Sequence, residues 1–336
     1  MAAVHTGSIA TTPTTARRHS LQRRGPPALR GWITLDPLFR KVCAAFGLSI
    51  VSLLGFVVYE LLRGSSASLA RFGASFVFDR IWDPVAEKFG AATFVYGTAV
   101  TSVIALLIAV PLGIGIAIFL VEMAPRAVRE VAGFLVELLA AIPSIVYGLW
   151  GLFVLAPIVR DGLAPVLRTT LGFLPLFTGP SYGLGMLTAG LILAVMVLPF
   201  IAAVSRDVLS AVPQMQREGS LALGATKWET IWHVVLPYGR AGISGAVILA
   251  LGRALGETMA VTMVIGNSPQ IVASLFAPGY TMSSVIANEY SEASGQLYLS
   301  SLTELGLLLF VVTFAVNGVA RLLIWRMSRG AEGSRA

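Results

Sequence analysis

The sequence predicts an all-α polytopic membrane protein with six transmembrane helices. Of its 336 residues, 56% are hydrophobic and 12% are charged, whereas soluble domains carry about 25% charged residues. The mean hydropathy is +0.81. A membrane-spanning helix needs about 20 apolar residues. Six stretches meet this requirement, near residues 42–62, 94–121, 131–157, 183–204, 242–266 and 301–320.

The predicted spans divide the chain into four segments. Residues 1–41 form a basic tail rich in Thr, Pro and Arg, and the absence of apolar periodicity predicts disorder there. Residues 42–93 hold the first span and an outer segment. Residues 94–320 hold the other five spans, and residues 321–336 form a C-terminal tail.

Lysine and arginine are unevenly distributed between the two sides of the predicted membrane. With six spans both termini lie on one side. The segments on that side hold seventeen Lys and Arg residues and the outer segments hold six. The positive-inside rule therefore predicts that both termini are cytoplasmic. The same rule accounts for the net charge of +7 without a nucleic-acid partner.

Arg253 and Glu257 lie within the fifth predicted span. An arginine at the centre of a spanning helix costs about 2.5–3.5 kcal/mol on insertion scales, so it normally faces a partner, a cavity or a ligand pathway. Residues four apart share a helix face. Either the two side chains form an ion pair that only holds the bundle together, or Arg253 lies on a translocation path. In the second case its forked donors suit a tetrahedral oxyanion, and Glu257 orients Arg253 and competes with the anion.

Glu137 lies in the third predicted span. It could be a second partner for Arg253 or part of a gate in the substrate pathway. It could equally reach the membrane interface from the inner end of the span. Pro143 is expected to kink the same span.

The longest inner loop, residues 205–241, is expected to form two short helices around a glycine turn. Pro213 precedes a helical stretch and Gly224 interrupts it. A second stretch, residues 226–235, ends before Pro237. A short helix that projects from the membrane can seat in a cleft of a soluble ATPase and transmit its motion. The alternative is an amphipathic surface connector.

The same loop resembles the signature of ABC importer permeases, in which Glu-Ala-Ala is followed by three residues, Gly, nine residues and Ile-x-Leu-Pro. The spacing matches throughout, with Gly219 and Ser220 in place of the two alanines and Val234 in place of isoleucine. The residues that the signature assigns to ATPase coupling are Glu218, Gly219, Ser220, Gly224, Leu236 and Pro237.

From about residue 82 to residue 325 the chain resembles the C-type transmembrane permease subunit of phosphate-specific ABC importers. The likeness is carried by WDPVAEKFGAATFVYGTAVTS (82–102), ELLAAIPSIVYGLWG (137–151), residues 218–267 and APGYTMSSVIANE (277–289). Within residues 218–267, RALGETMAVTMVIGN favours the C-type subunit over its A-type sister. The resemblance implies the type I ABC importer permease fold, with a cytoplasmic coupling helix, in a bacterial plasma membrane.

The resemblance also implies partners. These are the sister A-type permease in a heterodimer, two copies of a cytoplasmic ATPase, and an extracytoplasmic phosphate-binding protein, all assembled at the lipid bilayer. The arginine and glutamate at positions 253 and 257 are expected to matter for transport in this family. The chain has no GxxxxGK[ST] phosphate loop. We therefore expect no enzyme activity and no cofactor in this chain, with ATP and Mg bound by the partner ATPase.

Three other functions compete with phosphate import. A permease for another oxyanion, sulfate or molybdate, fits the same motifs, because substrate choice in importers lies largely in the binding protein. An ATP-independent channel or secondary transporter would leave the inner-loop signature unexplained. An intramembrane enzyme has little support, since all three histidines lie outside the predicted spans. The single cysteine, Cys43, allows neither an intrachain disulfide nor a metal cluster. We therefore expect no catalytic residues and no metal site.

Overall fold

The computed structural model describes residues 36–332, which divide into two units, residues 1–56 and 57–336. Most of the predicted disordered tail, residues 1–35, lies outside the described residues, as do residues 333–336. Helix α1 (Asp36–Gly64) supplies the described part of the first unit and the start of the second. It begins inside the segment 1–41 that was predicted to be disordered. Pro37 falls in its first turn, where the fixed φ of proline suits a helix.

The second unit is helical apart from one antiparallel hairpin among the residues described. The hairpin strands are β1 (Trp82–Asp83) and β2 (Lys88–Phe89). The remaining α-helices, in chain order, are α2 (Ser66–Phe72), α3 (Ser75–Phe78), α4 (Ala92–Ile118), α5 (Arg126–Ala140), α6 (Ser144–Trp150), α7 (Ala156–Ile158), α8 (Ala164–Leu171), α9 (Met186–Ser210), α10 (Gln214–Ala222), α11 (Lys227–Thr230), α12 (Leu236–Gly256), α13 (Met259–Val264), α14 (Met282–Glu289) and α15 (Gln296–Glu332). Four π-helical turns and one 3-10 turn connect them: η1 (Phe119–Met123), η2 (Gly151–Leu155), η3 (Val159–Leu163), η5 (Ile231–Val235) and η4 (Pro175–Phe177).

Six helical stretches in the described part of the chain are long and apolar enough to cross a membrane. They are Phe39–Gly64, Ala92–Met123, Ser144–Leu171, Met186–Ser210, Lys227–Gly256 and Gln296–Leu322. The predicted all-α fold with six spans is confirmed. The third and fifth predicted spans, however, had the wrong bounds, and α15 continues to Glu332, past the predicted end of the sixth span at residue 320.

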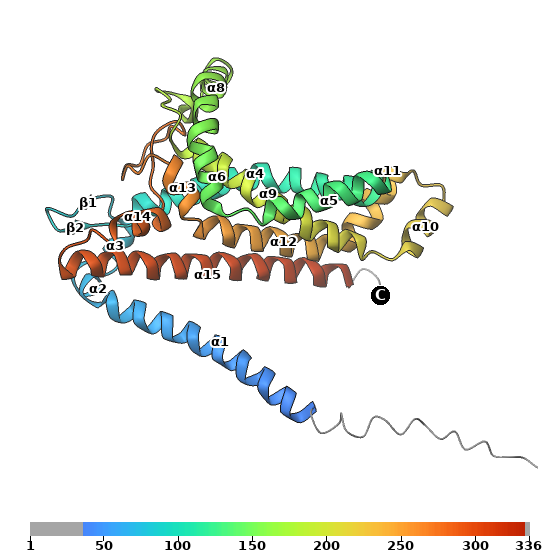
Figure 1. Ribbon diagram of the computed structural model, residues 1–336, viewed down its shortest axis with the longest axis horizontal. Coiled ribbons are helices and arrows are strands. Elements are labelled where there is room, and N and C mark those ends of the chain that lie inside the picture. Colours follow the sequence, from blue (N-terminus) through green and yellow to red (C-terminus); the bar gives the residue numbers. More distant parts are fainter. Residues whose placement is uncertain (1–35, 333–336) are drawn as a thin grey trace, which may run out of the picture. The chain divides into compact units, whose positions relative to one another are not determined.

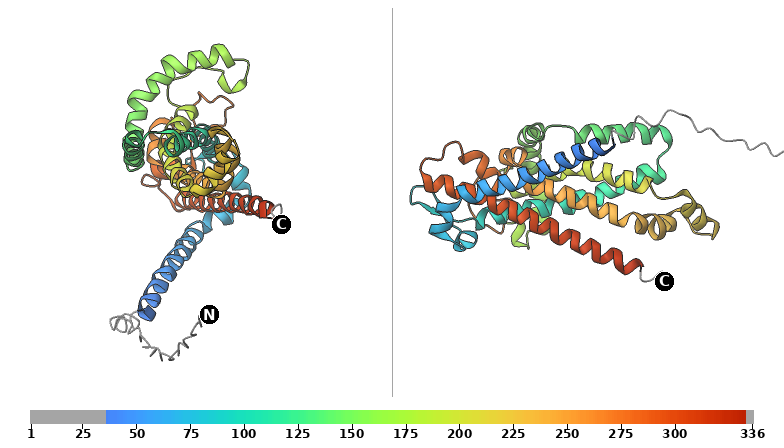
Figure 2. Two further views of the ribbon diagram at one scale, coloured as in Figure 1. Left: turned by 90° about the vertical axis from the view of Figure 1, so that its right-hand side faces the viewer. Right: turned by 90° about the horizontal axis from the view of Figure 1, so that it is seen from below.

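The third span was predicted over residues 131–157, but the chain breaks at Pro143. Helix α5 ends at Ala140, and Pro143 is extended with ψ at 140°. Proline has no N–H to continue the helix. The Tyr147 hydroxyl donates to the Leu139 carbonyl at 2.7 Å and helps to satisfy the broken end. The span then runs from Ser144 through α8, which stands away from the other helices of the unit (Figures 1 and 2).

The fifth span was predicted over residues 242–266, but the helix starts fifteen residues earlier, at Lys227. Thr226 and Glu229 form a capping box at its start. The π-helical turn η5 leads directly into α12, and Pro237 lies in the first turn of α12. A π turn shifts the backbone hydrogen bonds by one residue, so a proline without an N–H fits beside it. The helix ends at Gly256, before the second half of the predicted span.

Helix α9 forms the centre of the second unit and packs along α4 (Figure 1). Small residues set this close approach. A Cβ on Gly113 would lie 2.9 Å from Ile201 Cγ2, and one on Gly190 would lie 2.5 Å from Ile104 Cγ2. Apolar residues of α9, α12 and α13 complete the main core. This packing fixes α12, which carries Arg253, against the rest of the bundle.

An aromatic cluster closes the end of the unit opposite α10 (Figure 1). The Trp82 ring lies 4.9 Å from both Phe89 and Phe94, centroid to centroid. Glu289 accepts hydrogen bonds from Trp82 Nε1 at 2.8 Å and from the Tyr298 hydroxyl at 2.6 Å. These contacts tie the hairpin, α14 and the start of α15 together. The neighbouring Tyr280 hydroxyl is buried, and burial raises its pKa.

Candidate functional site

The predicted site residues fall in two regions that one helix connects. The continuous stretch Lys227–Gly256 starts beside the Gly224 turn and ends at the Glu257 break. At 1.5 Å per residue its 30 residues span about 45 Å. The loop assigned to ATPase coupling therefore lies beside one end of this continuous helix. Arg253, assigned to the substrate pathway, lies near its other end.

Arg253 lies in the last turn of α12 and is exposed in this chain. Among the side chains that the structure describes, no carboxylate lies within 4.0 Å of its guanidinium. The hydroxyl of Tyr147 on α6 is close enough for a Coulombic interaction with it. The forked donors of Arg253 are therefore available to a ligand or to a partner chain.

Glu257 does not share a helix face with Arg253, contrary to the prediction. It caps α12 in an extended conformation, with ψ at 129°, because the helix ends at Gly256. Its carboxylate accepts from the backbone N–H of Ala260 at 3.3 Å, and its carbonyl accepts from Ser283 Oγ at 2.6 Å. The predicted ion pair between Glu257 and Arg253 is absent from the described structure. Glu257 instead holds the junction between α12, α13 and α14.

Glu137 is paired with Arg206 rather than with Arg253. The distance from Arg206 Nη2 to Glu137 Oε1 is 2.8 Å, and the same guanidinium contacts Asp207 at 3.0 Å. Arg206 is mostly covered and Glu137 is largely exposed. Of the open alternatives, a direct pairing of Glu137 with Arg253 is excluded in this conformation. The ion pair joins α5 to α9.

The break between α12 and α13 leaves unwound backbone at the end of the fifth candidate span. Non-helical backbone at membrane depth is tolerated where protein buries it or where it lines a water-filled cavity. Broken helices of this kind often form substrate sites in transporters. Together with the unpaired Arg253 guanidinium, the break could bind an oxyanion. The roles of Arg253, Glu257 and Glu137 stay predictions.

The inner loop folds as the predicted pair of helices around a glycine turn. Helix α10 follows Pro213, and Gly224 has φ at +90°, a region that favours glycine. Ser220 Oγ lies 3.0 Å from Thr230 Oγ1, which links α10 to α11. The second helix was predicted to end before Pro237. In the structure it continues past Pro237 into the fifth span. The Gly224 turn thus lies next to the N-terminal end of the helix that carries Arg253.

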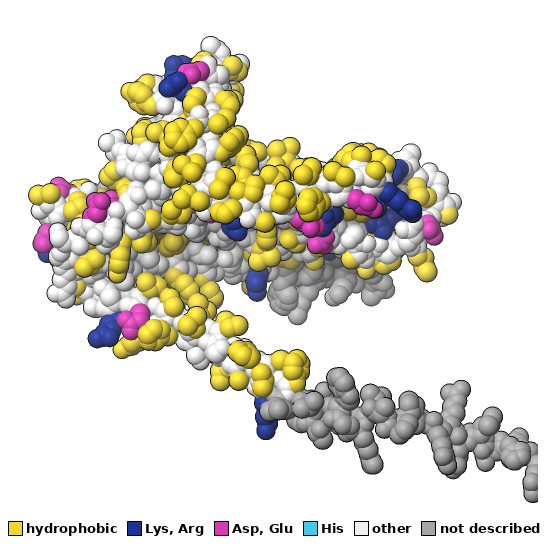
Figure 3. Space-filling model, viewed as in Figure 1, with side chains coloured by type: hydrophobic (Ala, Val, Ile, Leu, Met, Phe, Trp, Pro, Cys, Tyr) yellow, Lys and Arg dark blue, Asp and Glu magenta, His cyan; other side chains and the backbone are white. Residues whose placement is uncertain are grey.

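The α10–α11 loop presents side chains that the described part of the chain leaves exposed. Glu218 and Gly219 are exposed on α10. Met215 is 82% exposed and Leu223 is 91% exposed, which is unusual for large apolar side chains. Acidic and basic side chains gather at the same end of the bundle (Figure 3). Such a mixed surface is suited to docking another protein.

Leu236 and Pro237, the last two residues of the signature, lie where η5 meets α12. Leu236 packs on a small core formed by α9, α12 and the end of α4. Pro237 is exposed in the first turn of α12. Leu236 and Pro237 are therefore part of the spanning helix. Glu218 and Gly219 instead belong to the exposed surface of α10.

Sequence reasoning missed the buried pair of Arg217 and Glu122. Arg217 Nε lies 3.0 Å from Glu122 Oε1, and the two side chains are only 15% and 10% exposed. Arg217 also donates to the carbonyls of Leu209 and Val212 at the end of α9. It therefore ties α10 to α9 and η1. The sequence did contain a signal. Glu122 lies at the end of the second predicted span, and Arg217 lies in the loop 205–241, where it was used only to predict the orientation of the protein.

Residues 109–329 match the family described as the binding-protein-dependent transport system inner membrane component. The match spans well over half of the chain, and the chain belongs to this family. The protein is a multi-pass membrane protein and a permease, which agrees with the six candidate spans.

Named relatives agree with this class over most of the chain. The chain is 51% identical to the phosphate transport system permease protein PstC of Mesorhizobium japonicum, over 89% of this chain and 93% of that protein. It is 50% identical to the PstC protein of Haemophilus influenzae, over 89% of this chain and 95% of that protein. A probable PstC protein of Methanocaldococcus jannaschii is 40% identical, over 82% of this chain and 89% of that protein.

Solved structures share the fold at low sequence identity. A chain of a bacterial ABC transporter that imports the acidic polysaccharide alginate superposes with a TM-score of 0.56 and 16% identity, over 88% of this chain and 99% of that chain. A second structure, of the alginate transporter with a pentasaccharide-bound periplasmic protein, gives a TM-score of 0.57 at 16% identity, over 88% and 97% of the two chains. The predicted type I importer permease fold is therefore confirmed.

Proposed function

We propose that this chain is the transmembrane permease subunit of an ATP-driven importer of inorganic phosphate. The observation that carries the proposal is the 40–51% identity to phosphate transport system permease proteins over 82–89% of the chain. The geometry around Arg253 supports it. A tetrahedral oxyanion matches the forked donors of a guanidinium, which stays charged when desolvated.

The chain forms half of a translocation pathway, and a sister permease of the A type forms the other half. An arginine that faced lipid at this depth would be costly. Arg253 is nevertheless exposed in the isolated chain and has no ion pair with any side chain that the structure describes. A water-filled path between two permeases would keep this guanidinium hydrated and accessible to phosphate.

Two copies of a cytoplasmic ATPase supply the energy, and the α10–α11 loop of this chain docks on one of them. ATP and Mg belong to that partner, since this chain has no phosphate loop. Exposed Met215 and Leu223 offer the apolar contact, and Glu218 offers charge. Because α11 continues into α12, a displacement of the loop moves Arg253 directly.

The α10 end of the bundle faces the cytoplasm of a bacterial cell, and both termini lie on that side. The C-terminal part of α15 and the α10–α11 loop lie at the same end of the second unit (Figure 1). The aromatic end, with β1, β2 and α14, then faces an extracytoplasmic phosphate-binding protein. The positive-inside distribution of Lys and Arg supports this orientation.

Labelled-phosphate uptake tests the proposal. The whole transporter is expressed in a strain that lacks its own high-affinity phosphate importers, and excess sulfate is the competitor. Arg253→Ala is expected to lower uptake about tenfold or more, because hydrogen bonds to charged groups contribute about 1.5–3 kcal/mol each. Arg253→Lys is expected to restore little, since a point charge lacks the fork.

Arg160→Ala is the matched control. Arg160 is also an exposed arginine in a candidate span, but Asp161 pairs with it at 2.7 Å. Normal uptake in Arg160→Ala with loss in Arg253→Ala supports the pathway. Near-normal uptake in Arg253→Ala removes Arg253 from the mechanism. Uptake that sulfate abolishes reassigns the substrate to another oxyanion.

A further inference from the structure

Glu304 is a buried carboxyl group that no function described so far uses. It lies in α15 and is 5% exposed. A side-chain hydrogen bond joins it to Ser68 on α2, but its second oxygen, Oε2, is buried without a hydrogen-bond partner among residues 36–332. A buried carboxylate oxygen without a donor is costly, so a missing partner is expected at this position.

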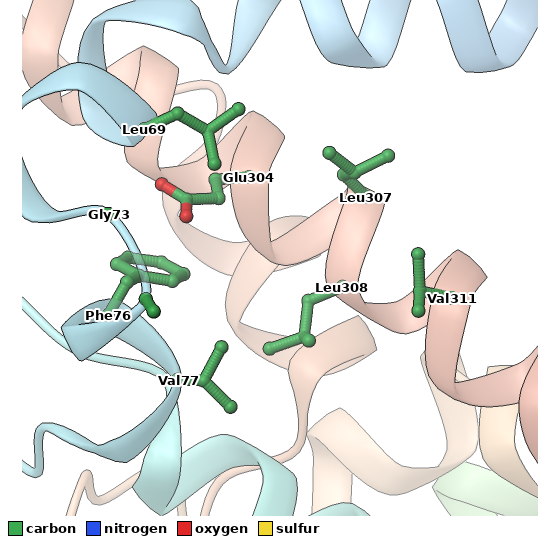
Figure 4. Close-up of a pocket in the computed structure, with 9 residues that line it drawn as sticks. Leu69, Gly73, Phe76, Val77, Glu304, Leu307, Leu308 and Val311 are labelled. Carbon is green, nitrogen blue, oxygen red and sulfur yellow. The ribbon is translucent and has the colours of Figure 1, made fainter.

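Glu304 Oε2 has space beside it for such a partner. A cavity of about 210 Å³ lies between α2, α3 and α15, and Glu304 is its one charged lining residue. In Figure 4 the Glu304 carboxyl projects from α15 toward Gly73 and Phe76. The other lining residues are Leu69, Ala74, Val77, Leu307, Leu308 and Val311. The cavity is therefore an apolar recess with one acidic group in its wall.

The second unit supplies no cation to this carboxyl. Among the described residues, no Lys or Arg nitrogen lies within 4.0 Å of Glu304. The nearby basic residue of α2, Arg71, is paired with Glu87 at 3.1 Å and is half exposed. Any cation that pairs with Glu304 therefore comes from outside the side chains that the structure describes.

The chemistry of the cavity selects the kind of cation. A divalent metal needs about six oxygen ligands, whereas this wall offers one carboxyl group. A quaternary ammonium is typically recognised by an aromatic cage, and Phe76 is the single aromatic lining residue. A primary ammonium is compact and donates hydrogen bonds, which is what Oε2 lacks. The cavity thus fits a primary amine attached to an apolar body.

The depth of Glu304 points to a lipid as the source of that amine. Glu304 lies eight residues into α15, or about 12 Å along its axis, at the end of the unit opposite α10. Counted from the start of the candidate span, this depth lies just inside the hydrocarbon core, below a headgroup layer of about 5–8 Å. Exposed Val311 and Phe314 continue the apolar wall along α15. We propose that this recess binds an aminophospholipid, with its ammonium on Glu304 and an acyl chain along α15.

Lipid retention measured by native mass spectrometry tests this site. The full chain, purified with the chains that stay bound to it, is exchanged into nanodiscs of equal phosphatidylethanolamine and phosphatidylcholine. The wild type is expected to retain phosphatidylethanolamine preferentially. Glu304→Gln keeps the shape and the bond to Ser68 but loses the charge, and is expected to lower this retention about tenfold.

Two further variants separate the site from general effects. Glu292→Gln, an exposed glutamate outside the candidate spans, is the matched control and should retain lipid as the wild type does. Ala74→Trp fills the exposed mouth of the cavity and should lose the lipid while Glu304 stays intact. Equal retention of both lipids by the wild type overturns the proposal. So does unchanged retention in Glu304→Gln, or a side chain of a partner protein in the cavity of the assembled transporter. None of these outcomes depends on the Arg253 pathway.

Discussion

At the scale of single residues, three acidic side chains in or beside the spans take donors that spacing along the chain did not indicate. Glu257 was expected to pair with Arg253, but the helix ends between them and Ala260 N–H is the donor. Glu137 is paired with Arg206, and Glu122 with Arg217. A charged side chain in a low-dielectric region needs an opposite charge or a hydrogen-bond donor. The presence of these charges in the sequence therefore indicates that each has such a partner. Spacing along the chain cannot identify them, because the two pairs join residues of different elements.

Arg217 is expected to matter more than its partner Glu122. Arg217→Met removes the donors for two carbonyls and leaves the Glu122 carboxylate buried, so we expect a loss of about 3 kcal/mol or more. Glu122→Gln keeps an oxygen that accepts from Arg217 and should lose less. Thermal unfolding of the purified transporter and its phosphate-stimulated ATPase rate measure both effects. Equal effects of the two variants would contradict the role of Arg217 as the tie between α9 and α10.

At the scale of elements, hydropathy predicts the number of spans but not where they break. Pro143 and Pro237 were both expected to interrupt helices. Pro143 ends one, while Pro237 continues another, because the π turn η5 precedes it and accommodates its missing N–H. The Gly224 turn could be predicted, since a positive φ favours glycine. The break at Glu257 could not be predicted from local sequence, and the Glu257 carbonyl accepts there from Ser283, which is distant in sequence.

The continuous helix Lys227–Gly256 is expected to act as a lever from the coupling loop to Arg253. Gly245 lies in its middle, and a Cβ there meets nothing within 4 Å. Gly245→Pro removes a helix hydrogen bond, at about 3 kcal/mol or more, and should abolish phosphate-stimulated ATPase activity while basal activity remains.

Gly245→Ala is the matched control. The added methyl group has open space, and alanine stabilises a helix interior by about 0.5–1 kcal/mol relative to glycine. We expect normal uptake and normal coupling in this variant. If Gly245→Pro also supports full coupling with a normal assembly, the motion of the loop reaches Arg253 by another route.

At the scale of the whole molecule, the two ends of the second unit have different chemistry. The α10 end carries exposed Met215 and Leu223 among charged side chains, which is the surface expected for a docked protein. The opposite end is closed by the aromatic cluster around Trp82 and by the recess at Glu304. Between them Arg253 is exposed without an ion pair among the described residues. This difference agrees with the proposal that the chain forms one half of a pathway and binds separate partners at its two ends.

This polarity predicts the outcome of labelling from the two sides of the membrane. Val85 in the hairpin loop is 96% exposed and Leu223 in the coupling loop is 91% exposed, so a cysteine at either position should react readily. The single native cysteine is first replaced in a Cys43→Ser background. A membrane-impermeant maleimide added to intact cells, after removal of any outer membrane, should then label Val85→Cys and spare Leu223→Cys. Inverted membrane vesicles should give the reverse if the α10 end faces the cytoplasm, as we propose. The opposite pattern would place the coupling loop outside the cell, where no ATPase could dock, and would refute the proposed coupling together with the orientation.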